Sequence, residues 1–188
     1  AATIDIAQIS DDGLYHGAPA VLVLMYHYIR EMPPEDDAIG RGLTVTPATF
    51  ELQLQQLLAA GYQTVTPQSI RQGSLPEKPA IITFDDGYSD AYTQAYPILQ
   101  KFGAQALFYV ITNRVGQDGF MSWPQIQEMA AYGMTFGSHT LDHVDLTETA
   151  LSAERMKEEL AKSKKTIEEH LGRPVTDFCY PSGQYNDV

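Results

Sequence analysis

The sequence of 188 residues has little cysteine and no long hydrophobic run. Its single cysteine, Cys179, excludes an intrachain disulfide and a cysteine-rich zinc site, so any metal would be bound by histidine and carboxylate side chains. No apolar run reaches the roughly 20 residues that a membrane-spanning helix needs, and the longest is "APAVLVLMYHYI", which is typical of a buried strand. The first ten residues, "AATIDIAQIS", do not resemble a secretory signal peptide, and both exported and cytosolic origins stay open.

Positive charge is also scarce. The chain has 12 Lys and Arg against 24 Asp and Glu, which gives a net charge of −12 at pH 7. This balance argues against a polyanionic partner such as nucleic acid and favours a neutral or cationic ligand. With 44% hydrophobic residues, a chain of this length is sufficient for one sizeable core and one domain.

The order of the strand signals predicts an α/β fold. Strands are expected in the segments 21–26, "YQTVTP", 80–84, "AQALFYVI", "MTFGSHT" and, as the last one, "VTDFCYP". Helices between successive strands imply parallel pairing, in either a closed α/β barrel or an open doubly wound sheet. In both architectures, functional residues collect at the carboxyl ends of the strands.

Capping signals place the helices between these strands. Thr46 followed by Pro47 predicts the start of a helix that ends at Gly61, and Ser122 begins "SWPQIQEMAAYG" in the same way. A further helix is expected from Ser89 to about Phe102. A long amphipathic helix is expected over 151–171, with Met156, Leu160 and Ile167 facing inward and its charged side chains in solvent.

Two neighbouring aspartates follow the buried strand "AIITF". Side chains of adjacent residues at a strand end start in opposite directions, so Asp85 and Asp86 can serve different purposes. Gly87 permits a sharp turn after them. An isolated "DDG" is most often an ordinary turn, and this interpretation remains open on the pair alone.

A histidine pair follows the strand predicted in "MTFGSHT". His139 and His143 lie four residues apart in "HTLDH", and in a helical or turn-like segment this spacing brings both imidazoles to one side. Two imidazoles and one carboxylate are a common ligand set for catalytic zinc, with a fourth position left for water. The alternative is two exposed histidines on a loop, and the aspartate pair favours the metal site instead.

The segments "TFDDG", "HTLDH" and "FCYPSGQYND" resemble the signature motifs of the polysaccharide deacetylase family, in its chitooligosaccharide-deacetylase-like (NodB-like) domain. The likeness runs from Val21 to the end. It implies an N-terminal extension over 1–20 and a deacetylase domain over 21–188 that is incomplete at its C-terminus. The implied fold is a distorted (β/α) barrel of about seven strands.

The resemblance also implies a role for each motif. Asp86, His139 and His143 would bind a divalent metal ion, and Asp85 would be the general base. Zn²⁺ is the expected ion, although Ni²⁺, Co²⁺ and Fe²⁺ suit such ligands almost equally. The third motif would form a wall of the substrate groove and help to bind the oxyanion, through Tyr180, Pro181, Ser182 and Gly183.

The third motif departs from the form Arg-x-Pro-Tyr-Gly that many members have. Cys179 stands at the arginine position and Ser182 at the tyrosine position, so Asp85 must be oriented in another way. Loss of the arginine is associated with the branch of the family that acts on poly-β-1,6-N-acetylglucosamine of biofilms. Cys179 itself is expected to be a small core residue. The implied activity is removal of N-acetyl groups from that polymer, or alternatively from peptidoglycan or chitin oligosaccharides.

The chain stops at Val188, before the segment in which the family carries a late histidine as general acid. The general acid therefore cannot be named, and a fragment of a longer protein is one interpretation. His27, at a strand end, either faces the site or makes a structural hydrogen bond. A monomer is expected, extracellular or at the bacterial cell surface, in association with the membrane or cell wall. Two other functions stay open: a catalytically incomplete glycan-binding module, and hydrolysis of a different amide.

Overall fold

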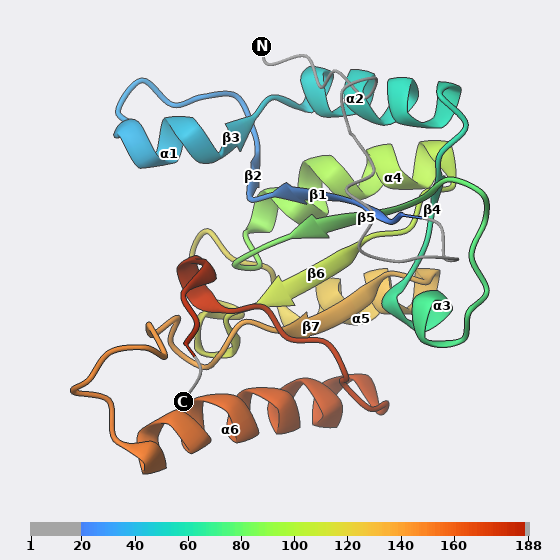
Figure 1. Ribbon diagram of the computed structural model, residues 1–188. Helices are drawn as coiled ribbons and strands as arrows, with labels where there is room; N and C mark the ends of the chain where they lie inside the picture. The colour runs from blue at the N-terminus through green and yellow to red at the C-terminus, as the bar shows by residue number, and fades with distance from the viewer. Residues whose placement is uncertain (1–19, 187–188) are drawn as a thin grey trace.

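A parallel β-sheet forms the centre of the computed structural model, which describes residues 20–186 (Figure 1). Its strands lie in the order β1 (Leu22–Tyr26), β5 (Pro79–Phe84), β6 (Leu107–Val110) and β7 (Thr135–Ser138), and β4 (Gln63–Thr64) pairs with the start of β5. A second small sheet pairs β2 (Tyr28–Ile29) with β3 (Thr44–Val45). The expected fold class, α/β with parallel strands, is confirmed, whereas closure into a barrel of about seven strands stays a prediction.

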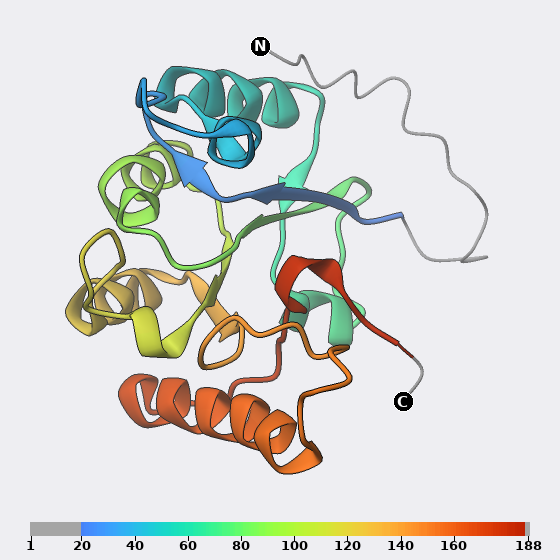
Figure 2. The ribbon, with the colours of Figure 1, turned by 90° about the vertical axis from the view of Figure 1, so that its left-hand side faces the viewer.

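The longer helices follow one another along one side of the sheet (Figures 1 and 2). They are α2 (Pro47–Ala59), α4 (Tyr96–Phe102), α5 (Trp123–Tyr132) and α6 (Ala153–Leu171). Two shorter helices, α1 (Ala38–Leu43) and α3 (Pro67–Arg71), lie apart from this row. A π-helical segment, η2 (Ala91–Ala95), leads into α4, and short 3₁₀ turns cover Thr112–Arg114 and Pro181–Gly183. In the part of the chain that the structure describes, no helix is both long and apolar enough to cross a bilayer.

The predicted caps begin and end these helices. Thr46 Oγ1 accepts the N–H of Thr49 at the start of α2. Ser122 and Gln125 form a capping box at the start of α5, and Gly133 ends that helix at a φ of 114°. The expected helix from Ser89 begins instead at Ala91, as the π-helical segment.

Aromatic rings in neighbouring strands form a row across the sheet. Tyr26, Phe84 and Phe108 lie in register on β1, β5 and β6, and Phe136 continues the row on β7. Ring centroids are 4.8 Å apart for Phe84 and Phe108 and 5.4 Å apart for Phe108 and Phe136. This buried row aligns the carboxyl ends of the four strands, where the polar motifs begin.

Helix α6 differs from its expected pattern. Ile167 is fully buried, but Leu160 is 36% exposed, and the buried positions of the helix include the polar residues Glu159 and Ser163. The prediction that Leu160 faces inward, with every charge solvated, is therefore wrong. Glu159 is buried because its carboxylate accepts backbone N–H groups of the loop after β7.

The last segment is not a strand, which corrects the prediction for "VTDFCYP". It makes a single parallel bridge to β7, between Ser138 and Phe178. Ser138 donates its N–H to the carbonyl of Asp177, and Cys179 donates its N–H to the carbonyl of Ser138, both at 3.0 Å. The segment is thereby fixed beside the end of β7. The expected N-terminal extension falls, except for Ala20, outside the described residues.

Candidate metal centre and active site

Asp85 and Asp86 lie on a tight turn at the end of β5. The N–H of Asp85 still bonds to the carbonyl of Tyr26 on β1, at 2.9 Å, so this residue is held by the sheet. Asp86 has a φ of 71° and Gly87 a φ of 83°, which are left-handed conformations. A Cβ atom at Gly87 would lie 3.0 Å from Val110 Cγ1, so glycine is needed for close packing as well as for the turn.

His139 and His143 are brought together by a turn rather than by a helix. Thr140 and His143 have φ values of 66° and 59°, and the N–H of His143 donates to Thr140 Oγ1 at 2.9 Å. The two imidazole centroids are 4.8 Å apart. The predicted convergence of both rings on one side is therefore present, through a strained loop after β7.

The two rings converge on Asp86. Its Oδ1 lies 3.4 Å from Nε2 of His139 and 3.4 Å from Nε2 of His143. This oxygen is buried and has no hydrogen-bond partner among residues 20–186. One ligand atom from each of the three residues lies within 4.8 Å of the others. Because a buried carboxylate without a donor is costly, this donor set fits a cation, and it matches a three-ligand zinc site.

Hydrogen bonds fix the orientation of His139. Its Nδ1 lies 2.9 Å from the carbonyl oxygen of Cys179 and donates its proton there, so Nε2 is directed toward Asp86. Burial lowers the pKa of His139, but the adjacent Asp86 carboxylate and the neighbouring Cys179 outweigh it and raise the pKa to about 10. The site therefore attracts positive charge, here a proton, at the position where a metal would bind.

The neighbouring carboxylates have opposite electrostatic environments. Burial, the largest cause, raises the pKa of Asp85, and the charges of His139 and His27 only partly oppose it. Burial also acts on Asp86, but the close contact with His139 and the charges of both ligand histidines lower its pKa. The pKa of His143 is lowered by burial and by the charge of His139. Asp86 is thus suited to hold a cation, and Asp85 to accept a proton.

His27 and Cys179 lie next to Asp85. His27 Nε2 is 4.0 Å from Asp85 Oδ2, and its side chain is 15% exposed. Cys179 Sγ is 3.6 Å from the same oxygen. His27 therefore faces the site, which was one of the two positions expected from the sequence. Cys179 is half-buried beside the candidate base, so the expectation that it is a core residue is wrong.

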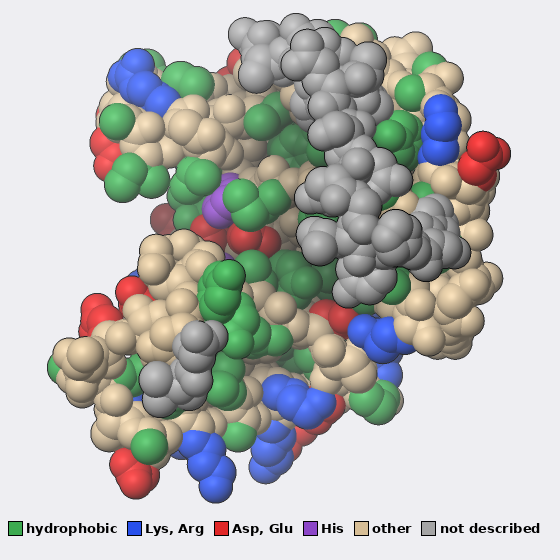
Figure 3. Space-filling model, viewed as in Figure 1, with side chains coloured by type: hydrophobic (Ala, Val, Ile, Leu, Met, Phe, Trp, Pro, Cys, Tyr) green, Lys and Arg blue, Asp and Glu red, His purple; other side chains and the backbone are tan. Residues whose placement is uncertain are grey.

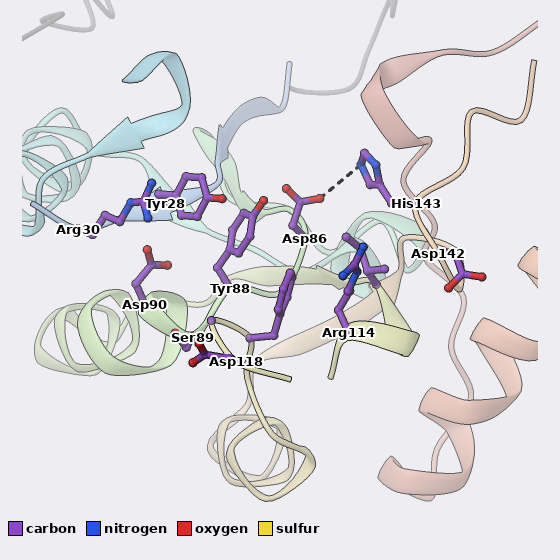
Figure 4. A pocket seen from close by; sticks show the side chains of 13 residues that line it. Tyr28, Arg30, Asp86, Tyr88, Ser89, Asp90, Arg114, Asp118, Asp142 and His143 are labelled. Atoms are coloured by element: carbon purple, nitrogen blue, oxygen red, sulfur yellow. Dashed lines mark ion pairs between the residues drawn. The ribbon is translucent and has the colours of Figure 1, made fainter. Parts of the chain in front are cut away.

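A cavity of about 800 Å³ opens over this centre (Figures 3 and 4). It includes Asp86 and His143, and its other side chains include Tyr28, Arg30, Tyr88, Asp90, Arg114, Asp118, Phe120 and Asp142. Tyr28 and Tyr88 stack with ring centroids 3.9 Å apart, and Phe120 extends the stack. Burial, followed by hydrogen bonds with Tyr28 and Asp86, raises the pKa of Tyr88, so its hydroxyl stays protonated beside the metal site.

The third motif surrounds the centre only in part. Tyr180 is 46% exposed and lines a separate hollow with Phe178 and Tyr185, outside the cavity that contains Asp86. Pro181 is buried, and Ser182 has a φ of 55°. The N–H groups of Gly183 and Gln184 bond to carbonyls within this turn. The substrate roles of Tyr180 to Gly183 stay predictions.

Sequence reasoning missed the residues that support the histidine loop. Glu159 on α6 is fully buried and accepts the N–H groups of Leu141 and Asp142 at 2.9 and 3.0 Å. Ser163, one turn later, lies 2.7 Å from Ser138 Oγ and donates to the carbonyl of Thr140. Nothing in the charged pattern of α6 distinguishes Glu159 from its neighbours. The position of Tyr88 in the cavity could have been predicted from the sequence, because Tyr88 directly follows "DDG".

Comparison with known proteins identifies the group to which these motifs belong. A family model described as polysaccharide deacetylase matches residues 72–188. The candidate polysaccharide deacetylase YxkH of Bacillus subtilis is 37% identical over 90% of this chain, which spans 59% of YxkH. The poly-β-1,6-N-acetyl-D-glucosamine N-deacetylase of Staphylococcus epidermidis is 26% identical over 89% of this chain and 66% of its own.

A solved structure shares the arrangement of the chain as well. The Streptococcus pyogenes deacetylase PplD, solved in complex with acetate, superposes with a TM-score of 0.82 at 34% identity. The match covers 90% of this chain and 77% of that one.

Proposed function

This chain belongs to the polysaccharide deacetylase family, and we propose that it hydrolyses the N-acetyl groups of N-acetylglucosamine units in an extracellular polysaccharide. The observation that carries the proposal is the convergence of Asp86, His139 and His143 beside the free carboxylate of Asp85. The chain spans only 59% of YxkH, so the activity is proposed for the longer protein as well as for this part.

Asp86, His139 and His143 would hold a divalent metal ion, with Zn²⁺ the first choice. Such an ion lowers the pKa of a bound water to about 7 and polarises the acetyl carbonyl. The protein contributes the geometry, because Cys179 and Glu159 fix the His139 ring and the histidine loop through hydrogen bonds. Asp86 and His143 line the cavity, so a bound ion would be accessible to substrate.

Asp85 would take the proton from the attacking water. Its pKa is raised by burial, which makes it a stronger base than an exposed aspartate, and general base catalysis is typically worth about 10²- to 10⁴-fold. The N–H of Ser182 would donate to the developing oxyanion. A proton must also reach the leaving amine. His27 Nε2 lies 4.0 Å from Asp85 Oδ2, beyond direct hydrogen-bond distance, and no described residue is assigned as the general acid.

The substrate is proposed to be poly-β-1,6-N-acetylglucosamine of biofilms. Support comes from the S. epidermidis relative that carries this activity in its name, at 26% identity, and from the absence of arginine in the third motif. Peptidoglycan and chitin oligosaccharides are the alternatives. A polymer of this kind implies an extracellular or cell-surface location, with the protein acting as a monomer.

The test separates the two aspartates. Asp85→Asn should abolish acetate release from N-acetylglucosamine oligomers while zinc binding, measured by calorimetry, stays near wild type. Asp86→Asn should lose both, because it removes a ligand. Near-native acetate release by the Asp85→Asn protein would show that Asp85 is not the base.

A panel of oligomers then separates the substrates and the alternative class. Acetate release from β-1,6-linked oligomers above that from β-1,4-linked chitin and from peptidoglycan fragments supports the biofilm polymer. Binding of oligomers without acetate release, with zinc present, supports a glycan-binding module, which the altered third motif also favours.

A further inference from the structure

A stack of aromatic rings forms one wall of the cavity beside Asp86 (Figure 4). The ring centroids of Tyr28 and Tyr88 are 3.9 Å apart, and Phe120 extends the stack at 5.2 Å from Tyr88. The guanidinium of Arg30 lies 3.8 Å from the centroid of the Tyr28 ring. Because Tyr88 lies between two other rings, its hydroxyl rather than its ring face is available to the site.

The backbone of Tyr88 is fixed as well as its ring. An isolated antiparallel bridge pairs Tyr88 with Phe120, and the N–H of Ser89 donates to the carbonyl of Gly119 at 2.9 Å. The position of the Tyr88 hydroxyl is therefore set by both its ring and its backbone. Little further conformational entropy is lost when such a group makes a hydrogen bond at the site.

The hydroxyl of Tyr88 lies beside the carboxylate of Asp86. One oxygen of Asp86, Oδ1, faces Nε2 of both His139 and His143 at 3.4 Å, and the other oxygen points toward Tyr88 (Figure 4). Burial is the main cause that raises the pKa of Tyr88, and the neighbouring Tyr28 and Asp86 add to it. The phenol is therefore a hydrogen-bond donor next to an acceptor. Carboxylates that bind metals are commonly held by such a partner, which keeps one oxygen turned toward the ion.

We propose that Tyr88 is a positioning residue for the metal centre. Its hydroxyl donates a hydrogen bond to the Asp86 oxygen that does not face the histidines, and so keeps Oδ1 directed at the ion. The aromatic stack serves to hold this hydroxyl in place. The role rests on the metal site of the proposed function but not on deacetylation, because zinc binding can be measured without a substrate.

Tyr88→Phe tests the role, because it removes the hydroxyl and keeps the ring in the stack. We expect its zinc dissociation constant, measured by calorimetry, to rise about 10-fold, the lower end of the usual cost of losing the partner of a metal ligand. Tyr92→Phe is the matched control, because it removes a tyrosine hydroxyl that donates to Glu128 and does not line the cavity. Circular dichroism shows whether each variant is folded.

Cobalt in place of zinc gives a second measurement, because its visible absorption bands depend on the geometry of its ligands. In the cobalt-loaded protein, Tyr88→Phe should change these bands, whereas Tyr92→Phe should give the wild-type spectrum. Unchanged zinc affinity together with an unchanged cobalt spectrum in Tyr88→Phe would refute the positioning role. An equal loss of zinc affinity in Tyr92→Phe would refute it too.

Acetate release separates positioning from a direct catalytic role. If Tyr88 acts only through Asp86, excess zinc should restore the turnover of Tyr88→Phe to the wild-type value. Turnover that stays low at saturating zinc, with zinc affinity unchanged, would mean that Tyr88 acts on the substrate and does not position the metal ligand. If zinc affinity falls as expected but no protein releases acetate, the wild type included, Tyr88 keeps its role and the proposed function fails.

Discussion

Asp85 and Asp86 show how one turn gives two neighbouring carboxylates different properties. Both are buried, yet Asp86 faces two imidazoles while Asp85 faces a thiol and a more distant imidazole. Positive charge near Asp86 lowers its pKa, whereas burial raises the pKa of Asp85. The left-handed conformation of Asp86 separates the two side chains. Their different pKa values therefore follow from backbone geometry as much as from residue type.

Glu159 supports the loop that carries His139 and His143, although its hydrogen bonds are to the backbone and not to either imidazole ring. Its carboxylate accepts two adjacent N–H groups between His139 and His143, and it pairs with Arg155. Removing one charge from such an arrangement weakens both backbone hydrogen bonds. We interpret Glu159 as a positioning residue, which acts on the metal ligands through the backbone.

Glu159→Gln should therefore weaken zinc binding by about 10- to 100-fold, the usual cost of losing a residue that supports a metal ligand. Calorimetry on the folded protein measures the dissociation constant. Glu158→Gln is the matched control, because Glu158 lies next in the helix but is paired at the surface with Arg155 and Lys162. Equal zinc affinities in the two variants would show that Glu159 has no positioning role.

The site residues that sequence could predict are those in local motifs. Asp86, His139 and His143 are each recognisable by their neighbours in the chain, and the structure brings all three together. Glu159 could not be found in this way, because a buried acid and a solvated acid look alike in a helix of alternating charge. The contact of Cys179 with Asp85 joins residues 94 positions apart, and only the fold shows it.

At the scale of elements, the site depends on how closely the last segment approaches β7. Gly137 lies in β7, and a Cβ atom there would be 2.7 Å from the carbonyl oxygen of Asp177 and 2.7 Å from the ring of Tyr109. The absence of a side chain at Gly137 lets the backbone of residues 177–179 lie close beside the strand. The carbonyl of Cys179 can then accept the proton of His139.

Gly137→Ala should lower the free energy of unfolding by about 1–3 kcal/mol, because the added methyl group overpacks a site lined by backbone. Urea denaturation followed by circular dichroism measures this change. Gly42→Ala, in α1 with no atom within 4 Å of the added Cβ, is the control and should be neutral or slightly stabilising. A loss of the same size in both variants would mean that the effect is not the contact with Asp177.

Element prediction succeeded where the signal was local and failed where it depended on distant contacts. Thr46, Ser122 and Gly133 mark helix ends by their own side chains or conformation, and the structure confirms them. The last segment has strand-like residues, but it makes only one bridge because its backbone turns into the third motif. Helical periodicity predicts that Leu160 faces the core. In the structure Glu159 faces inward instead, because it accepts hydrogen bonds from the loop after β7.

At the scale of the whole molecule, charge distinguishes substrate from product. The chain carries a net charge of −12, and the cavity contains Asp86, Asp90, Asp118 and Asp142 with fewer basic groups. Arg30 is already paired with Asp36, and Asp142 is paired with Arg155, which leaves Asp86, Asp90 and Asp118. The proposed substrate is neutral, and each deacetylation adds one amine that is cationic below its pKa. Product should therefore be bound more tightly than substrate at low ionic strength.

Raising the salt concentration should weaken the binding of a glucosamine oligomer and leave the N-acetylated oligomer of equal length nearly unaffected. Screening is the reason, because the Debye length falls from about 10 Å at 0.1 M to about 3 Å at 1 M. Calorimetry with the Asp85→Asn protein, which should not convert one ligand into the other, gives both dissociation constants. The acetylated oligomer is the internal control for general effects of salt. Parallel changes in the two constants would show that the acidic cavity does not attract the product, and release of product would then not be limited by charge.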